Sequence, residues 1–206
     1  MKSLFNLALL TSIVATVSVS FVSVTILELL IPIALIILVL LSKDDVNSQL
    51  LTLCFTFVFT VSAVALFILK TVVFQLVESY FIQNIYAFSI QLTLSLLMLF
   101  LLKHRMTIAV ILTKGKSASV FEKNYAEGPL YFLVLTMVFI DFAALMENFL
   151  RNLELLGLNE ETAKMFWEVT FFFDYFAYLK AVPIFLCVLL LYIGLIVRTK
   201  RQPIQN

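Results

Sequence analysis

Residues 128–149 read GPLYFLVLTMVFIDFAALMENF, and Asp141 is the only charge in this stretch before Glu147. A helix needs about 20 mostly apolar residues to cross the hydrocarbon core of a bilayer. Proline is well accommodated in the first turn of a helix, so the Gly-Pro pair suits the beginning of one. The stretch therefore predicts a transmembrane helix over 130–149.

Similar apolar stretches recur along the chain, at 50–69, 85–102 and 171–197, with a longer one at 4–41. Of the 206 residues, 63% are hydrophobic and 13% charged, and the mean hydropathy is +1.09. Soluble domains are about 45–50% apolar and about 25% charged. So short a chain cannot hide this excess in a core, because small domains leave much of their surface in water. The sequence predicts an all-α, polytopic transmembrane bundle of about five spans without a soluble domain.

The amino-terminal stretch 4–41 is too long for one span and short for two. It contains no charged or Gly/Pro turn that would separate two halves. We therefore expect one crossing at 19–41, with 4–18 beside the bundle or at the interface. Two crossings, which make six spans in total, are the alternative. A cleaved signal peptide with Lys2 in its charged region is disfavoured, because the chain stays apolar beyond Ser20.

The distribution of charge predicts the orientation of the bundle, because an excess of Lys and Arg marks cytoplasmic segments. The segment 103–128 and the carboxyl-terminal tail are basic, whereas 150–168 is acidic. We expect 103–128 to be a cytoplasmic loop, the C-terminus to be cytoplasmic and 150–168 to be an external hairpin, in a bacterial inner membrane. Within that hairpin, Gly157 is typical of a helix end and Asn159 of a helix N-cap.

Polar residues within the spans are candidates for a functional site, because ionisable groups in hydrocarbon are costly. Lys180 falls between the depths of Asp141 and Glu147, so we expect a buried Lys180–Asp141 ion pair. Fixing helix register is the favoured role for this pair, ahead of binding a ligand or conducting protons. Lys180 alone, reaching the interface, is a further alternative. The candidate intramembrane network comprises Glu28, Asp141, Asn148, Asp174 and Lys180.

Glu147 and Glu28 differ in the partners that the sequence offers them. Glu147 stands four residues before Arg151, so the two are expected to pair at the interface. Glu28 has no evident partner in the sequence, and burial would favour its neutral form. A basic cluster at the inner end of the third span is a candidate contact for lipid headgroups; it comprises Lys103, His104, Arg105, Lys114 and Lys116.

Catalytic motifs are absent from the sequence. It has no HExxH, GxSxG, CxxC or glycine-rich nucleotide loop, and its single histidine excludes a bis-histidine haem. Cys54 and Cys187 are isolated in apolar runs and are expected to be small core residues. We therefore predict no catalytic residue, no cofactor and no metal site. The net charge of +1 gives no reason to expect a nucleic-acid partner.

The small size and the absence of catalytic motifs favour a non-enzymatic accessory, sensor or regulatory subunit. Its partners would be the lipid bilayer and another membrane protein or a second copy of itself. A small transporter or ion or proton channel that uses Glu28, Asp141, Asp174 and Lys180 is the alternative. A membrane-embedded enzyme is the third hypothesis.

Overall fold

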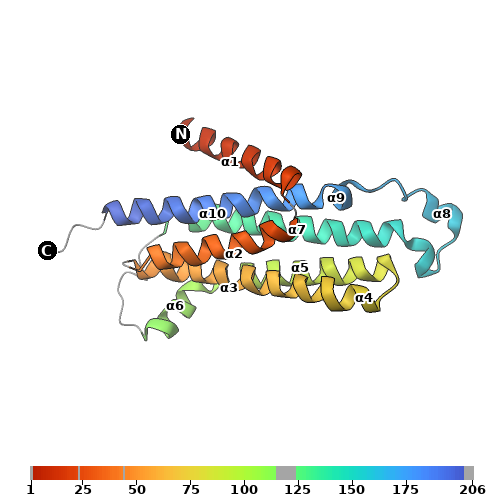
Figure 1. Ribbon diagram of the computed structural model, residues 1–206, viewed down its shortest axis with the longest axis horizontal. Coiled ribbons are helices and arrows are strands. Elements are labelled where there is room, and N and C mark those ends of the chain that lie inside the picture. The colour runs from red at the N-terminus through yellow and green to blue at the C-terminus, as the bar shows by residue number, and fades with distance from the viewer. Residues whose placement is uncertain (1, 23, 44, 115–123, 202–206) are drawn as a thin grey trace.

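The computed structural model describes residues 2–22, 24–43, 45–114 and 124–201, without the side chains of 2–5, 24–25 and 200–201. All regular secondary structure in these residues is helical, and most helices run along one common axis (Figure 1). The elements are α1 (Lys2–Phe21), α2 (Val24–Leu41), α3 (Val46–Ile68), the π-helix η1 (Leu69–Val73), α4 (Phe74–Leu76), α5 (Tyr80–Lys103), α6 (Arg105–Thr113), α7 (Glu127–Arg151), the 3-10 helix η3 (Leu153–Leu156), α8 (Glu160–Lys164), α9 (Phe171–Asp174) and α10 (Phe176–Arg201).

Four of the described helical segments are long and apolar enough to cross a membrane: Val46–Leu76, Tyr80–Lys103, Glu127–Arg151 and Phe176–Thr199. Together with α2 they form the bundle, in which α5 packs on α7, α3 on α5, and α10 on α7. The chain is thus an all-α membrane helix bundle. One predicted segment, 171–197, is not a continuous helix, because Tyr175 leaves helical geometry between α9 and α10.

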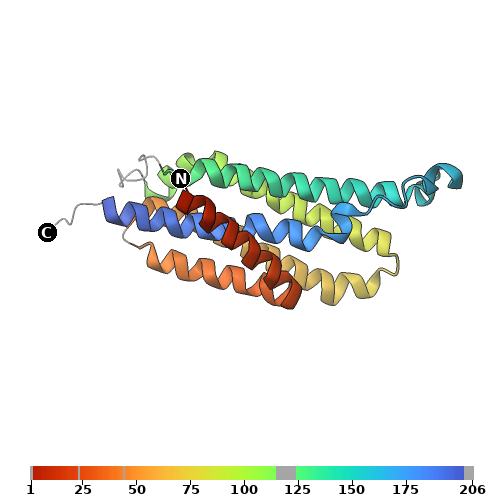
Figure 2. The same cartoon turned by 90° about the horizontal axis from the view of Figure 1, so that it is seen from above.

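The amino-terminal stretch forms two helices, and the helix that corresponds to the expected crossing at 19–41 begins later than residue 19. Residues 19–21 belong to α1, and α2 begins at Val24. Each helix packs on a different partner, α1 on α10 and α2 on α3, and α1 crosses α10 obliquely (Figure 2). Tertiary packing therefore divides a stretch that carries no local turn signal. α1 begins and α10 ends toward the same end of the bundle (Figures 1 and 2). The number of spans stays a prediction.

The segments at the two ends of the bundle are partly helical. Within 103–128, α6 is a nine-residue helix, so this part is not an extended loop. Residues 115–123 lie outside the described residues. At the other end, Gly157 adopts a left-handed φ of 89° after η3, and the Asn159 side chain accepts a hydrogen bond from the Glu161 N–H. The predicted helix end and N-cap are both confirmed.

The two ends of the bundle are called the Asp45 end and the α8 end, after the residue and the helix that lie there. The Asp45 end holds the main hydrophobic core, in which Phe55, Leu35, Leu51, Leu130 and Cys187 are fully buried. The α8 end holds a smaller core around Phe88, Ala144 and Leu145. The candidate functional site lies between α2 and these two cores, and residues of both cores line it.

Candidate functional site

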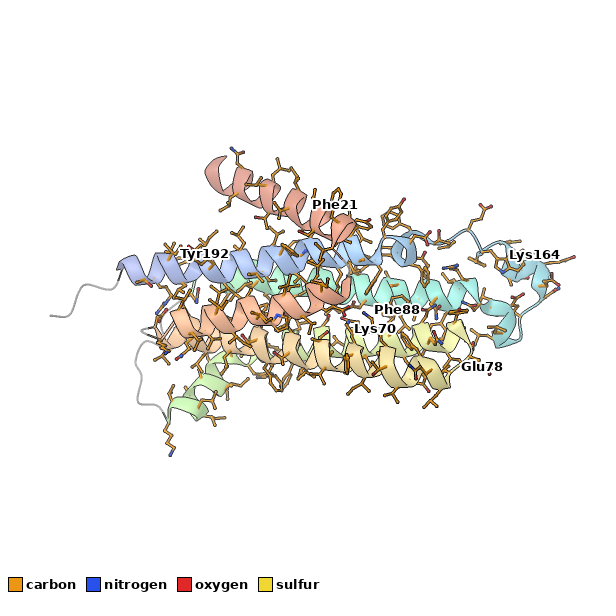
Figure 3. The ribbon with its side chains drawn as sticks, in the orientation of Figure 1. Phe21, Lys70, Glu78, Phe88, Lys164 and Tyr192 are labelled. Carbon is orange, nitrogen blue, oxygen red and sulfur yellow. The ribbon has the colours of Figure 1, made fainter. Side chains whose placement is uncertain are left out.

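A cavity of about 520 Å³ lies between α2, α3, α5 and α10, toward the α8 end of the bundle. This volume lies within the range of about 300–1,000 Å³ that small-molecule sites occupy. Lys70 and Phe88, which both line the cavity, are labelled in Figure 3. Most of the wall is apolar, and its polar members are Glu28, Ser62, Lys70, Asn84, Gln91, Ser95, Asp174 and Lys180.

The first polar feature is Lys180 on α10, which lines the cavity and forms a buried ion pair with Asp141 on α7, behind the wall. The Lys180 ammonium donates to both Asp141 carboxylate oxygens and, at 3.1 Å, to Ser95 Oγ. The Ser95 hydroxyl in turn donates to Asp141 at 2.6 Å. The structure thus contains the ion pair that the sequence predicted. Because an ammonium group has three N–H donors, all those of Lys180 are used within the protein.

A second pair joins Glu28 on α2 to Lys70 in η1, with 3.1 Å between Nζ and Oε2. The expectation that Glu28 has no partner is therefore wrong. The two residues are 42 positions apart, so no local periodicity connects them. Their side chains are 39% exposed for Lys70 and 23% exposed for Glu28. Lys70 lies in a π-helical segment, and such segments are frequent at functional sites.

Asp174 is the third ionisable feature of the wall. It is the last residue of α9, directly before the interruption at Tyr175, and it is exposed. In the part of the chain that the structure describes, no Lys, Arg or His nitrogen forms an ion pair with its carboxylate. The expected network is therefore divided: Asp141 and Lys180 are in contact, and Glu28 and Asp174 line the same cavity without contacting them.

Asn148 stands apart from the cavity wall. Its side chain accepts a hydrogen bond from Asn84 at 3.3 Å and donates to the Phe81 carbonyl at 3.3 Å. It is buried, and only Asn84 of these three residues lines the cavity. Asn148 therefore supports the wall from behind by fixing α7 against the beginning of α5.

Glu147 does not pair with Arg151, so that expectation is wrong. The Glu147 carboxylate is buried and accepts a hydrogen bond of 2.7 Å from the backbone N–H of Phe172 in α9. First-turn N–H groups lack partners within their own helix, and this acid supplies one. The Arg151 guanidinium instead lies 4.6 Å from the centre of the Phe173 ring. Glu147 thereby holds α9, and with it Asp174, beside the cavity.

A second group of buried charges lies at the Asp45 end. Arg198 of α10 donates to the Asp45 carboxylate from Nε at 2.5 Å and from Nη2 at 3.0 Å. Arg105 donates to Asn47 Oδ1 at 2.5 Å and forms an ion pair with Glu127. These contacts join α3, α6, α7 and α10. They lie away from the cavity and form a structural clasp.

The pKa values of the clasp residues show its electrostatic balance. Burial raises the pKa of Asp45, but hydrogen bonds from Arg198 and Ser48 outweigh it, so the net pKa lies below the usual value. Burial lowers the pKa of Arg105, and the Glu127 carboxylate opposes this change. Asp45 also accepts from the N–H groups of Asn47 and Ser48 as the N-cap of α3. That cap was a visible signal in the sequence, since Asp is a preferred N-cap residue.

The basic residues that were expected to contact lipid headgroups do not lie in one exposed cluster. Arg105 is 3% exposed and belongs to the clasp, so its predicted contact with lipid headgroups is wrong. The physical reason is that Glu127 and Asn47 provide partners that allow the guanidinium to be buried. Lys103, His104 and Lys114 are exposed, with the His104 ring 4.5 Å from that of Phe100. Lys116 lies outside the described residues.

The cavity itself was missed by the sequence interpretation, although its irregular helices are its clearest feature. Glu28 follows the interruption between α1 and α2, Lys70 lies in the π-helix, and Asp174 precedes the interruption at Tyr175. The arrangement can hold a small, largely apolar molecule beside fixed charges. In the described residues, no three His, Cys, Asp or Glu side chains are placed to hold a metal ion.

No protein-family model, curated protein or solved structure matches this chain.

Proposed function

We propose that this protein is a non-enzymatic membrane sensor or accessory subunit that binds a small, largely apolar molecule in its cavity. The observation that carries the proposal is the cavity of about 520 Å³, whose wall combines apolar side chains with a few fixed polar groups. Ligand sites have this composition because apolar walls supply affinity and polar groups fix orientation. Occupancy would change the packing of α2, α3 and α10, which present apolar faces to lipid or to a protein partner.

A binding role is favoured over conduction by what lies between the cavity and the Asp45 end. The main hydrophobic core fills that half of the bundle, and fully buried Phe55, Leu51 and Leu130 belong to it. Beyond the core, the clasp joins the helix ends through Asp45–Arg198 and Arg105–Glu127. A path for ions needs continuous polar or hydrated positions. The cavity therefore resembles a dead-end site more than one part of a channel.

A proton-transport role is also disfavoured by the contacts that Asp141 makes. Asp141 is fully buried and contacts both Lys180 and Ser95. A proton relay through Asp141 would have to break this pair in every cycle, and breaking a buried pair costs about 3–5 kcal/mol. The transporter hypothesis thus requires a second conformation, whereas binding uses the cavity as it stands.

The proposal is tested with a cavity-filling substitution and a matched control on the same helix. Ala63 lines the cavity, and Ala65 does not. Native mass spectrometry of the detergent-solubilised protein, titrated with the neutral aromatic probe 1-aminoanthracene, counts bound molecules directly. We expect one saturable adduct with the natural protein and with Ala65→Phe, and its loss in Ala63→Phe.

The opposite results would refute a binding role for the cavity. Equal binding by both variants would place the probe elsewhere on the protein. The absence of any adduct with a folded natural protein would mean that the cavity does not accept a ligand of this kind. Size-exclusion chromatography of each variant provides the folding control.

A further inference from the structure

We infer that the ligand of this cavity is a hydrophobic monocation, such as an ammonium or phosphonium compound with apolar substituents, and that Asp174 is the residue that selects its charge. This inference rests on the proposed function, because it names the class of molecule that the same cavity takes. It follows from which charges on the wall are already neutralised and which is not.

The two cations of the wall are already occupied. Lys180 directs its three donors at Asp141 and Ser95, and Lys70 contacts Glu28 at 3.1 Å. An anionic ligand at Lys180 would have to displace Asp141, and one at Lys70 would have to approach the Glu28 carboxylate. Displacing Asp141 would leave a buried charge without its partner, which is strongly unfavourable. The cavity is therefore poorly suited to anions.

Asp174 supplies the charge that remains. Lys70 is matched by Glu28 in the wall and Lys180 by Asp141 behind it, so with Asp174 these five described side chains carry one net negative charge. Its backbone is held in place, because Glu147 accepts from Phe172 two positions earlier. A cation in the cavity would gain a partner here without breaking any existing pair.

Aromatic rings next to Asp174 favour the same class of ligand. Phe88 contacts Phe173 and Phe176 edge-to-face, with ring centres 6.0 and 5.0 Å apart, and all three line the cavity. The faces of aromatic rings attract cations, more strongly when water is excluded. The protein's own cations already use this property, since Lys180 Nζ lies 6.0 Å from the centre of the Phe176 ring. A carboxylate beside such rings is suited to a cation with apolar substituents.

The test uses two ions of the same shape and opposite charge, tetraphenylphosphonium and tetraphenylborate. Equilibrium dialysis against matched detergent measures the binding of each to the purified protein. We expect saturable binding of the phosphonium and none of the borate. Asp174→Asn should weaken phosphonium binding by about tenfold or more, because it removes a nearby opposite charge. Asp174→Glu should retain binding, and Glu154→Gln, which changes an exposed acid outside the cavity, should leave it unchanged.

Two results would overturn the inference: equal binding of both ions, or phosphonium binding that Asp174→Asn does not weaken. Binding of 1-aminoanthracene to Asp174→Asn serves as its folding control, since a neutral probe does not need the charge. If the neutral probe binds the natural protein and the phosphonium does not, the cation inference fails and the proposed binding function stands. If neither binds, both fail.

Discussion

The two ends of the bundle use charged side chains in opposite ways. At the Asp45 end, Arg198 and Arg105 are buried and contact Asp45, Asn47 and Glu127 on neighbouring helices. At the α8 end, charged residues line a cavity of about 520 Å³, and Asp174 has no ion-pair partner among the described residues. The same residue types join the helices at one end and line a cavity at the other.

Helix regularity accounts for part of the difference. The clasp residues stand at ordinary helix ends, where Asp45 caps α3 and Arg198 belongs to the last turn of α10. The cavity is bordered by a π-helix at Leu69–Val73 and by interruptions before α2 and α10. Interrupted helices lose the regular side-chain spacing that lets neighbours interdigitate. The cavity therefore lies where the helices are irregular.

The first and largest expected effect concerns which end faces the cytoplasm. We expect single cysteines introduced at Lys114 and Asn159, in a variant without Cys54 and Cys187, to differ in an all-or-none manner. A membrane-impermeant thiol reagent applied to intact cells should label position 159 and spare position 114, because the basic end is expected inside. Both positions are exposed in the structure, so accessibility alone does not separate them. Labelling of position 114 alone would reverse the orientation of the comparison.

The second prediction concerns the buried pair at the cavity wall. Asp141→Leu and Lys180→Met should each lower the free energy of unfolding by about 3–5 kcal/mol, because each leaves an uncompensated buried charge. The double substitution should lie close to the natural protein, since apolar side chains can replace the pair. Thermal unfolding in detergent completes the double-mutant cycle. Strictly additive effects would show that the two side chains are not coupled.

The third prediction concerns the clasp at the Asp45 end. Asp45→Ala should lower the free energy of unfolding by about 3 kcal/mol, because Arg198 loses its buried partner and α3 loses its cap. Asp45→Asn should cost less, since the amide oxygen can still cap the helix. An equal cost for both substitutions would mean that the charge contributes nothing.

The same variants give a dependence on pH with a defined sign. The folded protein holds the pKa of Asp45 below its usual value, which is about 3.9 in an unfolded chain. The ionised carboxylate therefore stabilises the fold at neutral pH, and this contribution is lost as the pH falls below about 4 through the folded pKa. Unfolding measured between neutral pH and pH 3 should show the natural protein approaching Asp45→Asn in stability. A constant difference over that range would contradict the assignment.

The smallest expected effect is at the exposed pair beside the cavity. Lys70→Met should change the free energy of unfolding by less than about 1 kcal/mol, because partly exposed pairs are weak. Lys164→Met, in the exposed Glu160–Lys164 pair, provides the comparison. Unfolding in detergent measures both. A loss of several kcal/mol in Lys70→Met alone would show that lipid or packing makes this pair behave as a buried one.

The all-α membrane class follows from the amino-acid sequence without the structure, because apolar runs of this length are solvated only by lipid. It also determined the cap at Asn159 and the helix end at Gly157, which depend only on neighbouring residues. The Lys180–Asp141 pair was predictable from depth, since two charges at similar depth in adjacent antiparallel spans have few other partners. These features rest on local rules or on one-dimensional depth.

Tertiary structure alone decided the rest. The interruption between α1 and α2 has no turn signal, and only the structure shows that the two helices pack on different partners. Glu28 finds Lys70 at a separation of 42 residues, and Arg105 is buried because Asn47 and Glu127 come from two other parts of the chain. The cavity is likewise a space left between helices, and no sequence pattern predicts which spaces the side chains leave unfilled. Contacts and voids of this kind depend on the rotation of each helix about its axis, which depth and composition do not fix.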